Sequence, residues 1–272
     1  MMYFQIFFLY PFLMFCLSAC ILVQKNQSFE FEVRKDISFS ADVPTLKGDL
    51  YLPKTTDENK TRPAVVVVHG GGWINRTGDM SSICKKLAKS GFVAFDITYR
   101  LAPDFHHPTQ LNDVIAAVEW LRENAATYSV DVRRFGAWGY SAGAHLALLA
   151  GLDAKNGLRA LVAGGTPADL TVWPESPLVN KLIGHPVQTH LAQWQQASPV
   201  NHVKSDSPPV FLYHGEWDQL VEVDQVDKMK NALQVAKVPV ETYRVSFLGH
   251  FAVFLLSAEA DRRAVDFLKR TL

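Results

Sequence analysis

The sequence lacks an excess of charge of either sign, and this balance limits the partners to be expected. Its 272 residues include 27 lysines and arginines against 27 aspartates and glutamates, so the formal net charge is zero. No cluster of basic residues stands out, and a nucleic-acid partner is therefore not expected. Internal repeats and long low-complexity segments are also missing. With 48% hydrophobic residues, the chain has the size and composition of one large domain with a buried core.

Cysteine is equally scarce, with three in the whole chain. Cys16 and Cys20 lie near the N-terminus, which leaves Cys84 alone in the body of the chain and excludes an intramolecular disulfide there. Cys84 shares a predicted helical face with Met80 and Leu87, so we expect a buried structural thiol. The sequence also has no HExxH motif and no His–carboxylate cluster at ligand spacing, so it predicts neither a metal site nor a cofactor.

The N-terminal segment 1–23 is uncharged, and the first charged residue of the chain is Lys25. A run of this length is long enough to span a bilayer as a helix. It also ends in Leu17-Ser18-Ala19-Cys20, which resembles the lipobox of bacterial lipoproteins, where the chain is cut before a cysteine that carries lipid. We expect a lipidated Cys20, a tether over 24–30 and a location on the periplasmic side of the cell envelope. An uncleaved membrane anchor and an ordinary signal peptide are the alternatives.

Strand and helix patterns alternate along most of the remaining chain, 31–272. Apolar–polar alternation predicts exposed antiparallel strands over 29–38 and 46–52. Apolar runs predict further strands over 64–68, 92–99, 135–140, 158–163, 210–213 and 241–247. Helices are predicted over 79–89, 109–126, 142–150, 221–236 and 252–268, with Gly91 and Gly151 ending the first and third. This order predicts an α/β fold, a mostly parallel central sheet flanked by helices.

Residues 168–198 interrupt this alternation. Trp173, Pro174, Pro177 and Trp194 give the segment the pattern of an irregular excursion between two strands. Long connections in such sheets usually carry function, so we interpret 168–198 as a lid or a wall of a pocket.

A short motif, Gly139-Tyr140-Ser141-Ala142-Gly143, lies between the strand at 135–140 and the following helix. Such a motif arises by chance in about one chain in ten of this size, so Ser141 needs companions to be interpreted as a nucleophile. A serine hydroxyl needs a base, a group that orients the base, and donors for the oxyanion that forms. The stretch HGGGW at 69–73 follows the valine strand, and its glycines allow the backbone N–H groups to approach a ligand closely.

The base and its orienting group are predicted at the ends of two later strands. Asp218 follows the strand at 210–213, with Glu216 and Asp224 as local competitors and a helix-capping role as the alternative interpretation. His250 follows the last strand and precedes the last helix. Among the other histidines, His145 has a position that favours packing. His185 and His190 fall in the segment 168–198 and are further candidates for contact with substrate.

These residues resemble the esterase/lipase branch of the α/β hydrolases, from about Lys47 to the end of the chain. The HGGGW and GYSAG motifs, the YRLAP segment at 99–103 and the order Ser141, Asp218, His250 carry the resemblance. Hormone-sensitive-lipase-like members usually have Asp before the nucleophile and a helical N-terminal cap, whereas this chain has Tyr140. The stretch GYSAGAHLA around Ser141 is more similar to feruloyl/acetyl-xylan-esterase-like proteins and to kynurenine formamidases. The resemblance implies an α/β-hydrolase fold with a small or minimal cap.

The resemblance also implies a carboxylesterase that works through a Ser141–His250–Asp218 triad. Backbone N–H groups of three residues form the expected oxyanion hole: Gly71, Gly72 and Ala142. Because they neighbour these elements, the expected pocket walls are Trp73, Tyr140 and Phe251. Because few residues are left to form a cap over the site, we expect small ester substrates with short acyl groups. Two other hypotheses remain open: an arylformamidase of the kynurenine-formamidase type, and a catalytically inactive, membrane-tethered binding protein on the same fold.

Overall fold

The computed structural model describes residues 28–54 and 60–272. Its centre is an eight-stranded sheet in the order β1-β2-β4-β3-β5-β6-β7-β8. The first two strands pair antiparallel to each other, β2 is antiparallel to β4, and all other neighbours are parallel. The strands are β1 (Phe31–Ser38), β2 (Lys47–Pro53), β3 (Arg62–Val68), β4 (Val93–Ile97), β5 (Val130–Tyr140), β6 (Ala160–Gly164), β7 (Val210–Gly215) and β8 (Val240–Val245). The predicted mostly parallel α/β sheet is confirmed.

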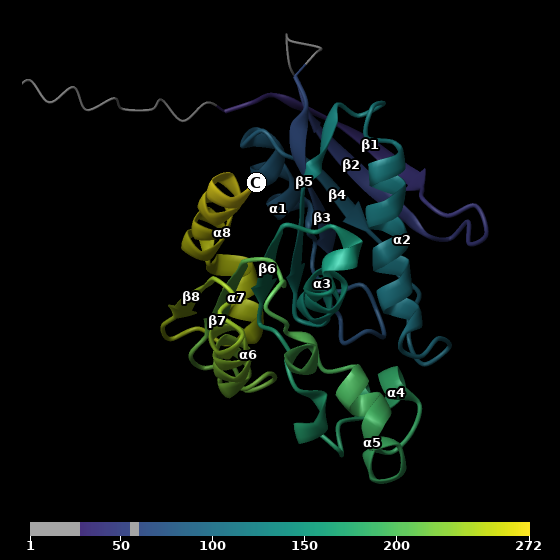
Figure 1. Ribbon diagram of the computed structural model, residues 1–272, viewed down its shortest axis with the longest axis vertical. Coiled ribbons are helices and arrows are strands. Elements are labelled where there is room, and N and C mark those ends of the chain that lie inside the picture. Colours follow the sequence, from purple (N-terminus) through teal and green to yellow (C-terminus); the bar gives the residue numbers. More distant parts are fainter. Residues whose placement is uncertain (1–27, 55–59) are drawn as a thin grey trace, which may run out of the picture.

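Helices cover both faces of this sheet (Figure 1). One face packs on α1 (Ser81–Lys89), α7 (His250–Leu256) and α8 (Ala258–Thr271). The opposite face packs on α2 (Thr109–Glu123), α3 (Ala142–Leu152) and α6 (Asp224–Val235). The five residues from Ala64 to Val68 in β3, an alanine and four valines, are completely buried, as expected for an apolar strand between two helical layers. Cys84 lies buried in the α1 layer.

The N-terminal strands were predicted to be exposed, and this is wrong for β2. From Leu50 to Pro53 the strand is buried, although β1 is largely half-buried or exposed. The reason is position: β2 pairs with β1 on one side and with β4 on the other, so it is an inner strand of the sheet.

Two helix boundaries also differ from the prediction. Gly151 does not end α3 but lies inside it, where an added Cβ would be 2.1 Å from Leu161 Cδ2. It is therefore a packing glycine that lets the helix approach β6. The predicted helix over 252–268 is two helices that meet at Ser257, whose hydroxyl accepts a hydrogen bond from Ala260 N and caps the second helix.

The segment 168–198 is not irregular, contrary to the prediction. It contains a 3₁₀ turn (Leu170–Val172) and two short helices, α4 (Pro177–Ile183) and α5 (Val187–Gln196). These helices lie together at one end of the molecule, at the bottom of Figure 1. Trp194 of α5 is completely buried, and its indole N–H donates to His185 O at 2.9 Å. Pro177, one of the residues that suggested a loop, is the first residue of α4, and a further proline, Pro186, stands directly before α5.

The expected lipid or membrane segment 1–23, with Cys20, and most of the tether lie outside the described residues. Within residues 28–54 and 60–272, no helix is long and apolar enough to cross a membrane.

Candidate active site

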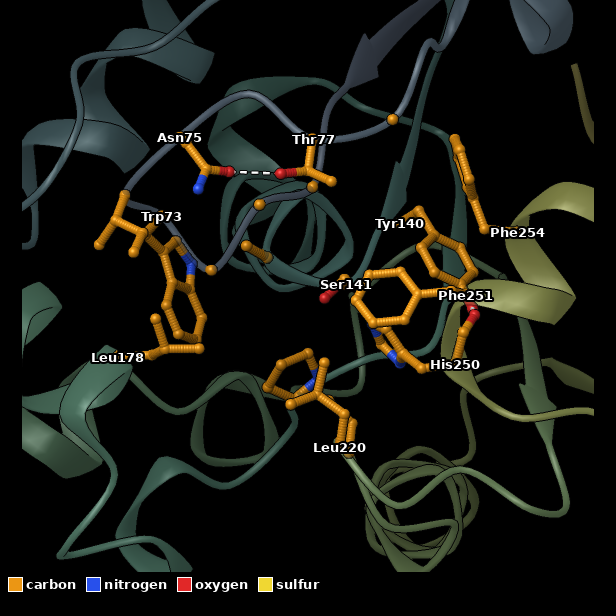
Figure 2. Close-up of a pocket in the computed structure, with 18 of the residues that line it drawn as sticks. Trp73, Asn75, Thr77, Tyr140, Ser141, Leu178, Leu220, His250, Phe251 and Phe254 are labelled. Atoms are coloured by element: carbon orange, nitrogen blue, oxygen red, sulfur yellow. Dashed lines mark hydrogen bonds between the residues drawn. The ribbon is translucent and has the colours of Figure 1, made fainter.

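The candidate site is a pocket of about 280 Å³ at the carboxyl ends of the central strands. Figure 2 shows Ser141 facing the pocket, with Trp73 and Leu178 on one side and His250 and Phe251 on the other. All five residues line the cavity. The elements that form it are the β3–α1 loop, the β5–α3 turn, the segment before and within α4, the β7–α6 loop and α7.

Ser141 lies on a sharp turn between β5 and α3, with φ of 55° and ψ of −122°. A positive φ is strained for a residue with a side chain, and such strain recurs at nucleophile positions. Two backbone hydrogen bonds hold the turn, since Ser141 N donates to Gly164 O at 2.8 Å and His145 N donates to Ser141 O at 3.0 Å. The strand end and the helix start therefore fix the serine backbone jointly.

The two glycines of the motif are required by close backbone contacts around this turn. A Cβ at Gly139 would lie 2.1 Å from Gly143 O, and a Cβ at Gly143 would lie 2.1 Å from Val68 O. Helix α3 therefore presses directly on the ends of β5 and β3. This contact brings the start of α3 beside the loop that follows β3.

Asp218 and His250 come together although 32 residues separate them in the chain. His250 Nδ1 donates to Asp218 Oδ2 at 2.6 Å, and both side chains are buried. Because Nδ1 carries the proton in this bond, Nε2 of the neutral imidazole is left as an acceptor. His250 also lines the pocket with Ser141.

The Asp218 carboxylate accepts hydrogen bonds at both oxygens. Oδ1 accepts from Leu220 N at 3.0 Å and from Val221 N at 2.9 Å, while His214 Nε2 lies 3.3 Å from Oδ2. Burial opposes ionisation, but the nearby His214 imidazole, whose Nε2 is hydrogen-bonded to Val221 O at 2.8 Å, and the hydrogen bond from His250 outweigh it and hold the pKa of Asp218 well below its usual range. The carboxylate is therefore ionised at neutral pH.

The alternatives to Asp218 lie elsewhere. Glu216 is exposed, and Asp224 begins α6, where it pairs with Lys228 at 3.1 Å. The capping interpretation of Asp218 is wrong for α6, because that helix begins six positions later. The carboxylate nevertheless accepts backbone N–H groups of its own turn, as a capping residue does.

The HGGGW loop curls back on itself after β3. Ile74 N and Asn75 N both donate to Gly71 O at 3.2 Å, and Thr77 N donates to Gly70 O at 3.2 Å. Gly71 has φ of 121°, and a Cβ there would lie 2.0 Å from Asn75 O, so no other residue fits. Both Gly71 and Gly72 line the pocket together with Ala142, which occupies the first position of α3. N–H groups in the first turn of a helix have no partner within it.

His69, at the start of this loop, faces away from the pocket lining. Its Nδ1 lies 2.7 Å from Gly70 O, and its ring stacks on Tyr99 with centroids 4.2 Å apart. Burial lowers the pKa of His69 to about 4, so the ring is neutral. His69 therefore contacts the backbone of the loop from outside the pocket lining.

The three expected wall residues all line the pocket, but they differ in burial and in hydrogen bonding. The buried Trp73 donates from its indole to His145 Nδ1 at 3.2 Å, and Phe251 is 61% exposed at the pocket mouth. Tyr140 is buried, and its hydroxyl donates to His250 O at 2.6 Å. Leu178 also lines the pocket, and it belongs to the segment 168–198 that was interpreted as a lid or a pocket wall. The sequence did not single out Leu220 and Phe254, which line the pocket as well.

The remaining histidines lie outside the pocket lining. His145 is fully buried and joins Trp73 to Ala197 O, which lies 2.6 Å from its Nε2, so the predicted packing role is confirmed. His185 and His190 stack on each other with centroids 4.2 Å apart and do not line the pocket, so the suggested contact with substrate is not supported.

A sheet in this order, with a serine on the turn after β5, defines an α/β hydrolase. The profile of the BD-FAE family matches residues 48–233, more than half of the chain, and the chain belongs to this family. A truncated carbohydrate esterase from gut microbiota shares the fold, with a TM-score of 0.79 and 24% identity over 90% of this chain and 97% of that one.

Two curated relatives represent the two chemistries under consideration. The chain is 29% identical to the probable carboxylic ester hydrolase LipM of Mycobacterium tuberculosis, over 85% of this chain and 58% of that protein. It is 28% identical to kynurenine formamidase of Meyerozyma guilliermondii, over 70% of this chain and 79% of that protein. The chain spans 53% to 62% of the length of three Mycobacterium tuberculosis esterases that it matches.

Proposed function

We propose that the protein is a carboxylic-ester hydrolase that works through an acyl-enzyme on Ser141. The observation that carries the proposal is the His250–Asp218 bond of 2.6 Å, beside a pocket that Ser141 and His250 both line. A histidine with Nδ1 bound to a carboxylate and Nε2 free is arranged to accept a serine proton. The ester hydrolase named among the relatives supports the same chemistry.

In the first step, His250 Nε2 takes the Ser141 proton while Ser141 Oγ attacks the carbonyl carbon of the ester. The ionised Asp218 stabilises the imidazolium that forms and keeps its ring oriented. The N–H groups of Gly71, Gly72 and Ala142 bind the oxyanion that develops on the carbonyl oxygen. The imidazolium then returns the proton to the leaving alkoxide, which departs as an alcohol.

In the second step, a water molecule gives its proton to His250 and attacks the acyl carbon. The tetrahedral intermediate collapses, the bond to Ser141 breaks, and the proton passes back to Oγ. Since the same base and the same oxyanion donors act in both halves, loss of any one group slows the whole cycle.

Ser141→Ala tests this mechanism. We expect turnover of p-nitrophenyl acetate to fall nearly to the uncatalysed rate, and labelling by a fluorophosphonate probe to disappear. Ser129→Ala is a matched control, because Ser129 also has a positive φ, of 53°, but lies outside the pocket lining. A Ser141→Ala variant that keeps most of its activity contradicts the proposal. A wild-type chain that neither labels nor turns over esters supports the inactive binding protein instead.

The pocket supports small substrates. Its volume is about 280 Å³, and its walls are largely apolar, with Trp173, Leu178 and Val179 contributed by the segment 168–198. We expect kcat/KM in a series of p-nitrophenyl esters to peak at short acyl chains. A maximum at long acyl chains contradicts this part of the proposal and leaves the serine mechanism intact.

An arylformamidase is the second candidate, and the kynurenine formamidase among the relatives favours it. The same triad serves amide hydrolysis if His250 protonates the leaving amine. Comparing kcat/KM for N-formylkynurenine with that for short acetyl esters separates the two. A preference for the formamide that Ser141→Ala abolishes establishes the second candidate.

We further propose that the N-terminal segment tethers the enzyme to the cell envelope through a lipidated Cys20, with the catalytic domain on the periplasmic side. The lipobox-like sequence before Cys20 and the uncharged run 3–23 support this. We expect the full chain in the membrane fraction, with a mature N-terminus at a lipid-modified Cys20 that the Cys20→Ser variant lacks. A membrane-bound chain of uncleaved mass indicates an anchor instead, and a soluble chain contradicts tethering.

A further inference from the structure

The hydroxyl of Tyr140 is turned away from the substrate space and toward the backbone of His250. It donates to His250 O at 2.6 Å, and only 4% of the tyrosine is exposed. Figure 2 shows Tyr140 on the same side of the pocket as His250, whereas the Ser141 hydroxyl faces the cavity. The residue before the nucleophile is thus tied directly to the residue that serves as its base.

This bond joins two elements that are 110 residues apart in the chain. Tyr140 ends β5, and His250 begins α7. The tyrosine ring also packs on the His250 ring, with centroids 5.2 Å apart, and on Phe254 of α7, with centroids 5.0 Å apart. Movement of the α7 start relative to the Ser141 turn must therefore break one hydrogen bond and two ring contacts.

A glycine keeps the space that this contact needs. A Cβ at Gly165 would lie 2.9 Å from His250 Cε1 and 3.1 Å from the Tyr140 hydroxyl oxygen. Gly165 also has φ of 55°, a conformation that favours glycine. Three separate parts of the chain, the end of β5, the residue after β6 and the start of α7, therefore pack around this one hydroxyl.

The hydroxyl keeps its proton throughout the working pH range of the enzyme. Burial, reinforced by Tyr213 and the Asp218 charge, raises the pKa of Tyr140 well above its usual value. It therefore remains a hydrogen-bond donor while His250 cycles between its neutral and charged forms.

We infer that Tyr140 is a positioning residue whose hydroxyl fixes the His250 backbone, so that Nε2 faces Ser141 while Nδ1 stays on Asp218. The inference rests on the proposed function, since it assumes that His250 is the base. It assigns to Tyr140 a task different from that of a pocket wall. A wall residue alters substrate binding and selectivity, whereas a positioning residue alters the rate of proton transfer for every substrate equally.

The test compares Tyr140→Phe with Tyr213→Phe. Tyr213 is a matched control because it is buried, its ring centroid lies 5.9 Å from that of Tyr140, and its hydroxyl is also hydrogen-bonded, accepting from Trp138 Nε1 at 3.2 Å. Each variant deletes one buried hydroxyl from the same layer. The measurements are kcat and KM for two acetyl esters with different alcohols, the pH profile of kcat, the rate of fluorophosphonate labelling and the melting temperature.

For Tyr140→Phe we expect kcat and the labelling rate to fall about tenfold, with KM within twofold, the same loss for both esters and a shifted pH profile. For Tyr213→Phe we expect both rates within twofold of wild type, with a similar drop in melting temperature. Equal losses in the two variants, or wild-type kcat in Tyr140→Phe, overturn the inference. So does a change confined to KM or to one ester. Failure of the proposed function itself is recognised separately, because Ser141→Ala then retains activity.

Discussion

At the scale of single residues, the Asp218 carboxylate shows how one side chain meets two demands. Its Oδ1 accepts hydrogen bonds from two backbone N–H groups of its own turn, and its Oδ2 accepts a hydrogen bond from His250 Nδ1. The backbone bonds fix the orientation of the carboxylate, so that the second oxygen can fix the tautomer of the histidine.

This division leads to a prediction for Asp218→Asn. The two N–H donors at Leu220 and Val221 require an acceptor, so the amide oxygen of the variant will take the place of Oδ1. The amide nitrogen will then face His250 Nδ1, which must accept, and the histidine proton moves to Nε2. With Nε2 protonated, His250 cannot take the Ser141 proton. We expect kcat to fall on the order of 10³–10⁴-fold at neutral pH, as steady-state kinetics will measure.

Asp224→Asn is the control, because Asp224 lies on α6 and pairs with Lys228 at the surface. It should retain wild-type kcat. If Asp218→Asn retains kcat within tenfold, or if both variants lose it equally, the assignment of Asp218 is wrong.

The triad candidates could be predicted from the sequence because each follows a strand, and the ends of parallel strands meet at one edge of the sheet. Two supporting contacts could not. His214 lies within the strand that precedes Asp218, and nothing in its local pattern indicates that its Nε2 lies 3.3 Å from the carboxylate. The Tyr140 hydroxyl meets a backbone oxygen 110 residues away, and a main-chain acceptor has no sequence signature.

At the scale of elements, the junction of β3, β5 and α3 limits what Gly143 can become. Alanine favours a helix over glycine by about 1 kcal/mol, so helix propensity alone predicts that Gly143→Ala stabilises α3. The added Cβ would lie 2.1 Å from Val68 O, which is backbone and cannot rotate away. We expect this steric clash to outweigh the gain in helix propensity. The free energy of unfolding, measured by urea denaturation, should then fall by about 1–3 kcal/mol. Unchanged or increased stability contradicts this close packing.

Helix α4 sets the depth of the pocket through Leu178. A Cβ on Gly72 would lie 3.0 Å from Leu178 Cδ1, so this side chain covers the oxyanion loop. Its replacement by alanine removes three carbons from the wall, and each additional buried CH₂ of an acyl chain is worth about 0.8 kcal/mol. We therefore expect Leu178→Ala to raise kcat/KM for hexanoate relative to acetate on the order of tenfold, in p-nitrophenyl ester assays.

Leu191→Ala provides the comparison, because Leu191 lies on the neighbouring α5, is 49% exposed and does not line the pocket. Its acyl-chain profile should match that of wild type. A profile that stays unchanged in Leu178→Ala shows that this leucine does not limit the acyl group.

The elements that the sequence predicted wrongly share a physical cause, which is tertiary packing of short segments. In 168–198, prolines at helix starts resemble loop signals, and the helices gain their stability from buried residues such as Trp194. Gly151 has the local pattern of a helix end, but its function is to allow contact with Leu161. Long, strongly periodic segments such as α2 were predictable because their own apolar stripe determines them.

At the scale of the whole molecule, buried titratable groups link stability to pH. Burial lowers the pKa of His145 to about 3 and that of His69 and His107 to about 4. These rings stay neutral in the folded state, while the unfolded chain protonates them below about pH 6.5. Asp96 has the opposite effect, because burial, partly offset by Arg76, raises the pKa of its carboxyl to about 6.

The signs follow from the protons bound in each state. Between about pH 4 and 6.5 the unfolded state binds more protons at the three histidines, so their contribution to stability is lost as the pH falls through this range. At Asp96 the folded state binds more protons between about pH 4 and 6, so its contribution is lost as the pH rises. Each group contributes a slope of about 1.4 kcal/mol per pH unit. Because three groups oppose one, the histidines prevail.

We therefore predict that the free energy of unfolding falls by about 1–3 kcal/mol per pH unit as the pH is lowered from 6 to 4.5, measured by urea denaturation at several pH values. His145→Gln should reduce the slope of the free energy of unfolding against pH by about 1.4 kcal/mol per pH unit, which corresponds to one proton. The reason is that it removes a histidine whose pKa is lowered in the folded state. Asp96→Asn should make it steeper by about one proton, because it removes the opposing group. Comparing slopes rather than absolute stabilities separates titration from the packing that each substitution disturbs. Equal slopes in all three proteins, or stability that rises on acidification, show that other groups control acid unfolding.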